Sequence, residues 1–183
     1  MSQLTTQYVN QLKHLHRTTD FGSGGSKVPK KLQPYITSVD SLLDFGCGKG
    51  KFSTTVKEYN NDIKVYSYDP VTSPIDLPEQ VDIVYSSDVL EHVEPEFIDD
   101  TLDVLFNIAT KYQYHLIACH PAKKKLRDGR NAHLIIEQPN WWRNKLEKYN
   151  WSFVFEEVKE KDRFIQGQNI HMIKYIVLLE KNG

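Results

Sequence analysis

Short apolar runs alternate along the chain with stretches in which apolar residues recur every three or four positions. Continuous apolar runs are typical of strands buried in a parallel sheet, and the three-to-four-residue repeat is typical of amphipathic helices. The alternation therefore predicts an α/β fold with a mostly parallel sheet. Strands are expected at 42–45, 63–68, 81–86, 114–119, 151–156 and 172–179, and helices at 1–17, 30–37, 51–59, 95–111 and 138–149.

The two ends of the chain depart from this alternation. The polar stretch 159–169 predicts a hairpin-like connection between the last two strands, which makes the C-terminal strand antiparallel. Segment 19–27 is rich in glycine and serine, which suits either a flexible linker or a lid that closes over a site. The sequence predicts one domain, with an N-terminal helical or lid segment, 1–37, and a core, 38–183.

Residues 42–53 carry the most informative motif, in which a predicted strand leads through three alternate glycines, Gly46, Gly48 and Gly50, into a predicted helix. Glycine lets the backbone turn sharply and approach a ligand closely because it has no Cβ atom. The free N–H groups at the start of the helix face the crevice beyond the strand ends, where ligands of open α/β sheets bind. The motif predicts a site for a nucleotide-like cofactor.

Asp69 follows the next predicted strand, about twenty residues beyond the glycine motif. At this offset, an acidic residue in dinucleotide-binding folds accepts hydrogen bonds from the ribose hydroxyls. An aspartate that ends a strand before a proline, here Pro70, is also a common turn residue. The glycine motif favours the ribose role. A hydride-transfer dinucleotide is not favoured, because Lys51 stands where such proteins have a third glycine.

Composition narrows the class of protein further. The 183 residues suffice for one domain with a continuous core. The 23 basic and 24 acidic residues give a net charge of −1, which argues against a dedicated nucleic-acid binder. We expect no membrane partner, because no apolar run could span a bilayer and no signal peptide is recognisable. Cys47 and Cys119 are expected near strand ends without a disulfide, and a reduced, cytoplasmic setting fits them.

Residues 43–50, 68–70 and 87–93 together resemble the class I S-adenosylmethionine-dependent methyltransferases, and so does the hairpin-like end of the chain. The resemblance covers most of the sequence. It implies a Rossmann-like three-layer sandwich with a sheet of about six or seven strands, and S-adenosylmethionine as the cofactor. It also implies cofactor contacts from Asp44, Phe45, Gly46, Cys47, Gly48, Gly50, Asp69, Pro70, Ser87 and Asp88.

The resemblance assigns roles within that set. The backbone of the glycine motif would pack on the methionine and ribose portions, and Asp44 would support the loop or reach the methionine ammonium. Asp69 would hold the ribose diol, and Ser87 and Asp88 would lie near the sulfonium or the adenine. Carboxylates in this place are physically consistent, because the ammonium and the sulfonium are both positively charged.

Segment 71–80 departs from the family pattern. Family members usually have a further helix and strand between the ribose-binding acid and the next strand, and this segment is too short for both. We therefore expect a trimmed sheet of about six strands, with the adenine held by the loop 70–77.

Methyl transfer from a sulfonium requires alignment and, for a weak nucleophile, removal of a proton. Histidine titrates near neutral pH, so the candidate catalytic bases are His92, His120 and His133, which are expected beyond strand ends. His92 has an alternative role in capping a helix. His120 follows its strand directly, at the edge where an acceptor is expected.

No metal is assigned, but one pattern suggests an alternative. Asp88, Glu91 and His92 have a D/E-x-x-E-H spacing similar to the metal site of small-RNA 2′-O-methyltransferases and of some quinone O-methyltransferases, with His133 or His120 as the further ligand. Such a site could activate an acceptor hydroxyl. The same string also occurs in methyltransferases in which it is only structural.

The segment 120–136 is basic, and it indicates either a solvated loop or a substrate-facing loop that attracts an anion. Its five charges are Lys123, Lys124, Lys125, Arg127 and Arg130. The leading interpretation is methyl transfer to an O or N atom of a small or medium-sized acceptor, for which this loop favours an anionic group. The alternatives are a cofactor-binding module without turnover and an RNA- or DNA-modifying enzyme with a divalent metal at Asp88, Glu91 and His92. A small-molecule acceptor is favoured over nucleic acid, and the oligomeric state is left open.

Overall fold

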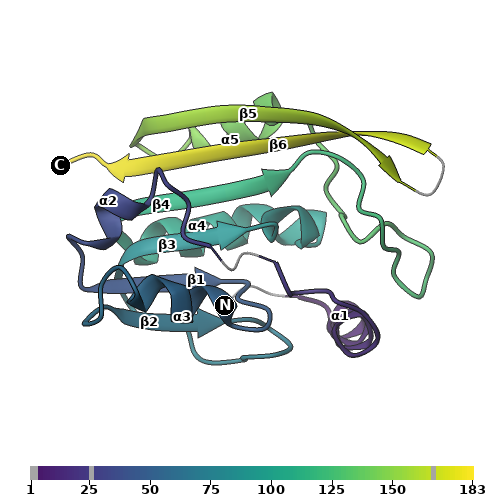
Figure 1. Cartoon of the computed structure of the whole chain (residues 1–183), viewed down its shortest axis with the longest axis horizontal. Coiled ribbons are helices and arrows are strands. Elements are labelled where there is room, and N and C mark those ends of the chain that lie inside the picture. Colours follow the sequence, from purple (N-terminus) through teal and green to yellow (C-terminus); the bar gives the residue numbers. More distant parts are fainter. Residues whose placement is uncertain (1–3, 25–26, 166–167) are drawn as a thin grey trace.

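The computed structural model describes residues 4–24, 27–165 and 168–183, which form one six-stranded sheet with helices on both faces (Figure 1). Parts of three sequence predictions lie outside the described residues: 1–3 of the first helix, 25–26 of segment 19–27, and 166–167 of the hairpin connection.

The sheet has the strand order β2-β1-β3-β4-β6-β5, in which β1 to β4 are parallel and β6 is antiparallel to both β4 and β5. This arrangement confirms the predicted mostly parallel sheet with an antiparallel C-terminal strand. The strands are β1 (Ser41–Phe45), β2 (Lys64–Tyr68), β3 (Val81–Ser87), β4 (Ala109–Ala118), β5 (Trp151–Ile165) and β6 (Gln168–Lys181).

The strand β2 forms one edge of the sheet, because the segment that joins it to β3 contains only turns and bends. In that segment the backbones of Asp69 and Ser73 bond to each other in a tight turn. The predicted trimming of the sheet to six strands is thus confirmed.

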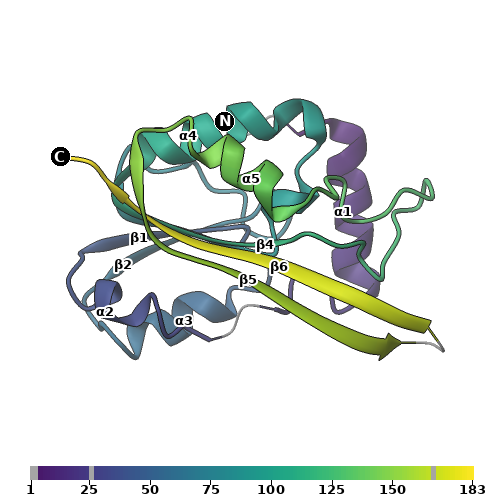
Figure 2. The same cartoon turned by 90° about the horizontal axis from the view of Figure 1, so that it is seen from above.

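Apolar side chains alternate between the two faces of the sheet and pack against a different pair of helices on each. Leu42 points to the face covered by α2 (Gln33–Ile36) and α3 (Lys51–Lys57), and Leu43 points to the face covered by α4 (Ile98–Ile108) and α5 (Pro139–Leu146). Figure 2 shows these two helical layers above and below the sheet.

The helix α1 (Thr6–Thr18) belongs to neither layer and lies across the carboxyl ends of the parallel strands (Figures 1 and 2). Its apolar face, with Tyr8, Leu12 and Leu15, packs on Leu126 and Ala132 of the loop after β4. Two short 3₁₀ helices, η1 (Leu90–His92) and η2 (Pro95–Phe97), connect β3 to α4. No helix in the described part of the chain is long and apolar enough to cross a membrane.

Most element boundaries differ from the sequence prediction by a few residues, and two of the differences extend strands of the sheet. The helix expected at 95–111 ends at Ile108, and β4 begins at Ala109, since Thr110 bonds through its hydroxyl to the Val81 carbonyl of β3. The polar stretch 159–169 is strand rather than connection, because β5 and β6 pair along almost its whole length. His171 contacts Glu160 and Asp162 across the hairpin, and such cross-strand ion pairs suit a solvated strand pair.

Candidate functional site

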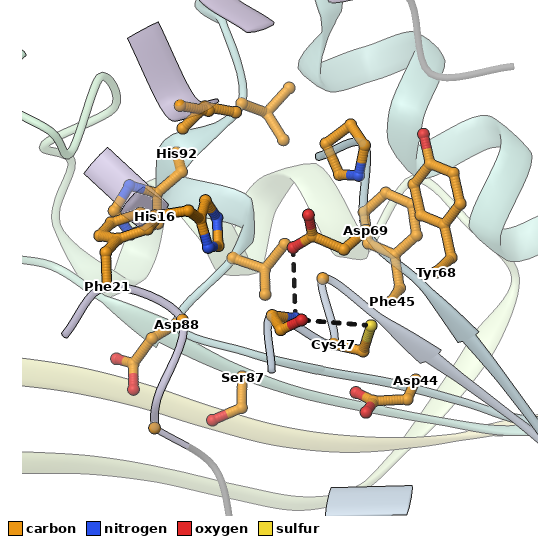
Figure 3. A pocket seen from close by; sticks show the side chains of 18 of the residues that line it. His16, Phe21, Asp44, Phe45, Cys47, Tyr68, Asp69, Ser87, Asp88 and His92 are labelled. Atoms are coloured by element: carbon orange, nitrogen blue, oxygen red, sulfur yellow. Dashed lines mark hydrogen bonds between the residues drawn. The ribbon is translucent and has the colours of Figure 1, made fainter. Parts of the chain in front are cut away.

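A cavity of about 240 Å³ lies at the carboxyl ends of β1, β2 and β3, and we call it the first cavity (Figure 3). All of the predicted cofactor-binding residues except Gly50 line it. Gly50 instead precedes α3 in a left-handed conformation and has no part in the lining. The structure therefore brings together residues from three separate stretches of the sequence, as parallel strand ends at one sheet edge require.

The glycine loop, residues 46–50, is held to β2 and covered by the N-terminal segment. The amides of Gly46 and Cys47 donate to the Tyr68 carbonyl at 2.8 and 2.9 Å, and the Lys49 amide donates to the Gly22 carbonyl at 2.9 Å. Gly48 has φ +53°, and a Cβ atom there would lie 2.8 Å from the Gly22 Cα atom. Only glycine permits both this backbone conformation and this close approach.

Asp69 is buried and organises the loops around the first cavity. Its Oδ1 atom accepts hydrogen bonds from the amides of Val71 and Thr72, each at 2.9 Å, and its Oδ2 atom accepts one from the Gly48 amide at 3.2 Å. Figure 3 shows the bond between Asp69 and the glycine loop. The turn role considered for Asp69 is therefore present, and the Oδ2 atom keeps one lone-pair site for a ligand.

Asp44 is a buried acidic residue in the lining of the first cavity. Its side chain is 3% exposed, and its Oδ2 atom has no hydrogen-bond partner in the described part of the chain. Burial, with a further contribution from Asp69, raises the pKa of Asp44 to about 7. A buried carboxylate without a partner is costly, so this oxygen fits a cationic group of a ligand in the first cavity.

Asp88 stands between the cavity and the antiparallel strands. It follows β3 with φ +53°, which is uncommon for a residue with a side chain and is often found at functional sites. The Lys174 ammonium on β6 contacts both of its carboxylate oxygens, at 2.8 and 3.0 Å. This ion pair joins the end of β3 to the middle of β6.

A second cavity of about 250 Å³ adjoins the first, and Phe21, Asp88 and His92 line both. His120 and His133 also line the second cavity, so the structure brings the three predicted catalytic histidines together. The ring centroids lie 4.8 Å apart for His92 and His133, and 5.6 Å apart for His120 and His133.

The three histidines share one hydrogen-bonding arrangement. The Nδ1 atoms of His92, His120 and His133 contact the backbone carbonyls of Ala132, Ile173 and His120, respectively. A carbonyl only accepts, so each Nδ1 carries a proton and each neutral ring has an unprotonated Nε2 atom. Burial lowers the pKa of His92 to about 4, with His133 adding to the shift, and burial also lowers the pKa of His133.

The N-terminal segment covers the junction of the two cavities, as Figure 3 shows for His16 and Phe21. The Phe21 ring meets the rings of His16 and His92 edge to face, at 5.0 and 5.1 Å. Asp20 pairs with Lys124, and the Tyr8 hydroxyl donates to the His92 carbonyl at 2.5 Å. The sequence offered a lid as one of two interpretations of segment 19–27, but it did not predict that α1 would pack beside the site. The apolar stripe of α1 was the only signal for that packing, and a stripe does not say what it packs against.

The basic residues of the loop after β4 divide between two environments. Lys123 and Lys124 line the second cavity, as does Lys174 from β6. Arg130 instead pairs with Asp128 at 2.9 Å, and Lys125 and Arg127 are exposed away from the lining. Two of the five basic residues of the loop thus line a cavity, and the other three face solvent.

The fold and the composition of the first cavity can be compared with known proteins. A family model described as a methyltransferase domain matches residues 17–158 of the 183-residue chain. The chain belongs to the methyltransferase-domain family. No curated protein matches it.

Solved structures resemble this methyltransferase domain at low sequence identity. TehB from Haemophilus influenzae is similar with a TM-score of 0.57 and 17% identity, over 85% of this chain and 63% of that one, so the chain spans under two thirds of TehB. The 1,6-didemethyltoxoflavin-N1-methyltransferase of Burkholderia thailandensis, with bound S-adenosylhomocysteine, has a TM-score of 0.59 and 12% identity, over 100% and 93%. Magnesium protoporphyrin IX methyltransferase from Synechocystis PCC 6803, with bound SAM, has a TM-score of 0.57 and 12% sequence identity. The match covers 95% of this chain and 99% of that one.

These comparisons confirm the predicted family and the predicted fold, and they support S-adenosylmethionine as the cofactor. The structure itself supplies a test of fit. The Asp44 Oδ2 atom, which has no hydrogen-bond partner in the described part of the chain, belongs to a residue that lines the first cavity, where it can hold a positively charged group of a ligand.

Proposed function

We propose that this methyltransferase domain transfers a methyl group to an O or N atom of a small or medium-sized anionic acceptor bound in the second cavity. The observation that carries the proposal is the junction of the two cavities at Phe21, Asp88 and His92. A cofactor in the first cavity and an acceptor in the second would meet there, as an in-line transfer requires.

The first cavity holds S-adenosylmethionine, which supplies a methyl group on a positively charged sulfonium. Asp44 faces the positive charge of the cofactor, and Asp69 holds the ribose hydroxyls while it fixes the glycine loop. The segment 1–37 serves as a cover, because its described part reaches the cavity through Phe21 and the loop through Gly22. Exclusion of water by such a cover strengthens the electrostatic interactions inside.

The second cavity selects the acceptor by charge. Lys123, Lys124 and Lys174 line it, and of these Lys124 and Lys174 already pair with Asp20 and Asp88. Lys123 has no ion pair among the described side chains, so it is the lysine that an acceptor anion meets directly. One unprotonated Nε2 atom among those of His92, His120 and His133 takes up the proton that the acceptor releases.

The charge of the acceptor is tested with a matched pair of lysine variants. We screen phosphorylated and carboxylated small molecules, their neutral analogues and oligonucleotides, and measure S-adenosylhomocysteine formation. For the acceptor found, Lys123→Ala should raise KM about fivefold, because an exposed ion pair contributes up to ~1 kcal/mol. Lys125→Ala, two residues away and outside the lining, should leave KM unchanged.

The same screen separates the alternatives. Methylation of a neutral analogue as fast as of the charged molecule would contradict the anionic acceptor. Turnover only on oligonucleotides, with steep salt dependence, would favour the nucleic-acid enzyme. Tight cofactor binding without any methylated acceptor would favour the binding module without turnover.

The affinity for S-adenosylhomocysteine should depend on pH through Asp44. In the free protein Asp44 has a pKa of about 7, so below pH 7 it is protonated and must lose its proton to face a cation. We therefore expect the affinity to fall by up to about tenfold per pH unit between pH 7 and 5.5, and to level off about one pH unit above the pKa. Titration calorimetry at several pH values measures this dependence.

Asp44→Asn is the control for this pH dependence. It should bind more weakly at pH 7.5 and should lose the slope between pH 7 and 5.5, since the nearby Asp69 and the ligand remain unchanged. An equal slope in the variant would assign the dependence to another group and would remove Asp44 from the cofactor site.

A further inference from the structure

Glu91, His92 and His133 lie close together, and His92 and His133 line the second cavity while Glu91 is fully buried. Glu91 and His92 belong to η1, and His133 comes from the loop after β4. One potential ligand atom from each of the three lies within 4.8 Å of the others. The loop is held in place by the Glu91 backbone carbonyl, which accepts the amides of Leu134 and Ile135 at 2.8 and 3.0 Å.

The Glu91 carboxylate is fully buried, and only one of its two oxygens has a hydrogen-bond partner in the described part of the chain. Its Oε1 atom accepts a hydrogen bond from the Ala118 amide at 3.1 Å, and its Oε2 atom has no partner in the described part of the chain. The His133 Nε2 atom is 4.0 Å from Oε1, beyond hydrogen-bond distance. A buried carboxylate oxygen in this position needs a cation or a donor to offset its loss of solvation.

The two imidazoles are oriented as metal ligands commonly are. In metal sites a histidine usually donates its other ring N–H to a backbone carbonyl or a carboxylate, which fixes both the tautomer and the direction of the ligating nitrogen. His92 donates in this way to Ala132 at 2.6 Å, and His133 donates to His120. Both Nε2 atoms therefore keep a lone pair available for coordination.

We propose that Glu91, His92 and His133 bind a divalent transition-metal ion through one carboxylate oxygen and two Nε2 atoms. Two imidazoles with one carboxylate favour Mn²⁺, Fe²⁺, Co²⁺ or Zn²⁺ over Mg²⁺ or Ca²⁺, which prefer oxygen ligands. Two ligands on opposite sides of an ion lie ~4.2 Å apart when each is ~2.1 Å from it, so small side-chain rotations close this group around an ion.

The sequence suggested Asp88, Glu91 and His92, with His133 or His120 as the further ligand, and the proposed set differs by omitting Asp88. Asp88 is turned toward β6 and neutralised by Lys174, and it is not among the grouped ligand atoms. His133 remains as the further ligand. The reason is the fold of the loop after β4, which bonds to the Glu91 backbone and brings a residue 41 positions from His92 to its side.

The position of the ion adds a role that rests on the proposed function. His92 and His133 line the second cavity, so the open coordination positions face the acceptor. A bound acceptor hydroxyl is acidified by the ion. Its proton passes to the Nε2 atom of His120, its oxygen forms the bond to the methyl carbon, and the carbon–sulfur bond breaks with its electron pair left on sulfur. An oxygen acceptor is therefore favoured over nitrogen.

Metal binding is tested on the whole chain without any acceptor. Mn²⁺ is titrated and followed by the loss of its free electron paramagnetic resonance signal, and Co²⁺ by its absorption spectrum. We expect one ion per chain, with affinity lowered at least about tenfold in His133→Ala and in Glu91→Gln. Glu91→Gln retains the acceptor for the Ala118 amide, which protects the fold.

His171→Ala is the matched control, because His171 lies beside Glu160 and Asp162 on the exposed hairpin. It should bind the ion as the unmodified chain does. The proposal is overturned if the unmodified chain binds none of Mn²⁺, Co²⁺ and Zn²⁺ stoichiometrically, or if His133→Ala and Glu91→Gln bind with unchanged affinity.

Cofactor binding and turnover separate this proposal from the function proposed above. S-adenosylhomocysteine affinity should be unchanged in His133→Ala, since His133 does not line the first cavity, while turnover on the identified acceptor falls. Stoichiometric metal binding without methyl transfer to any acceptor would leave the metal site standing and reject the proposed function. Methyl transfer that persists in a chelator, with no metal bound, would leave the proposed function standing and reject the metal site.

Discussion

Asp69→Ala is expected to abolish most of the binding of S-adenosylmethionine and to lower the melting temperature. The carboxylate accepts three backbone amides, from Gly48, Val71 and Thr72, and it is 6% exposed. Hydrogen bonds to a charged group contribute ~1.5–3 kcal/mol each, so the loops lose their arrangement together with the ribose contact. We expect the affinity for S-adenosylhomocysteine to fall at least about a hundredfold by titration calorimetry.

Two further variants separate the ribose contact from the loop structure. Asp69→Asn keeps an oxygen for the amides of Val71 and Thr72 but loses the charge and one acceptor. It should melt closer to the unmodified protein and still bind at least about tenfold more weakly, because one charge-assisted bond is lost. Glu79→Ala, in the same segment but exposed and outside the lining of the first cavity, should change neither quantity. Normal cofactor binding in Asp69→Ala would remove this residue from the site.

The sheet and the glycine loop were predictable because the information that specifies them is local. Leu42 and Leu43 lie on opposite faces of one strand, and a doubly covered sheet requires both to be apolar. Gly48 was informative for a local reason too. The loop beyond the strand end needs a left-handed backbone conformation at this residue, and that conformation favours glycine. The short segment after Asp69 predicted the missing strand from length alone.

The arrangement of the histidines depends on long-range contacts, and the sequence predicted only part of it. Each of His92, His120 and His133 could be placed beyond a strand end, but their meeting depends on the loop after β4 folding back onto η1. No local pattern encodes that return. Glu91 was similarly missed as a fully buried residue, because its position in a charged, helix-like stretch is equally typical of solvent exposure.

The N-terminal segment was predicted as either a linker or a lid, and its composition could not decide between them. The contacts that place it over the site involve the Phe21 ring, the Gly22 carbonyl and the Asp20 carboxylate. Each partner lies in a different part of the sequence: His92, Lys49 and Lys124. The described residues 19–24 of this glycine- and serine-rich stretch thus follow a defined path because distant groups hold them, although the composition is that of a flexible chain.

The dependence of cofactor binding on this cover can be isolated by two glycine variants of the same loop. In Gly48→Ala the added Cβ atom would lie 2.8 Å from the Gly22 Cα atom, so the N-terminal backbone has to move away. In Gly50→Ala the added Cβ atom meets nothing within 4 Å, although the backbone is equally left-handed, with φ +69° against +53°. Both variants carry the left-handed strain of ~1–2 kcal/mol, and only Gly48→Ala carries the collision.

Gly48→Ala should therefore weaken S-adenosylhomocysteine binding by at least about tenfold more than Gly50→Ala does, because it breaks the bond between the Lys49 amide and the Gly22 carbonyl and withdraws Phe21 from the cavity. Hydrogen exchange at the Lys49 amide should accelerate in Gly48→Ala and stay slow in Gly50→Ala. Calorimetry and exchange on the same preparations measure both effects. Equal losses of affinity in the two variants would mean that the N-terminal segment does not contribute to the cofactor site, and that the strain of the loop alone accounts for the result.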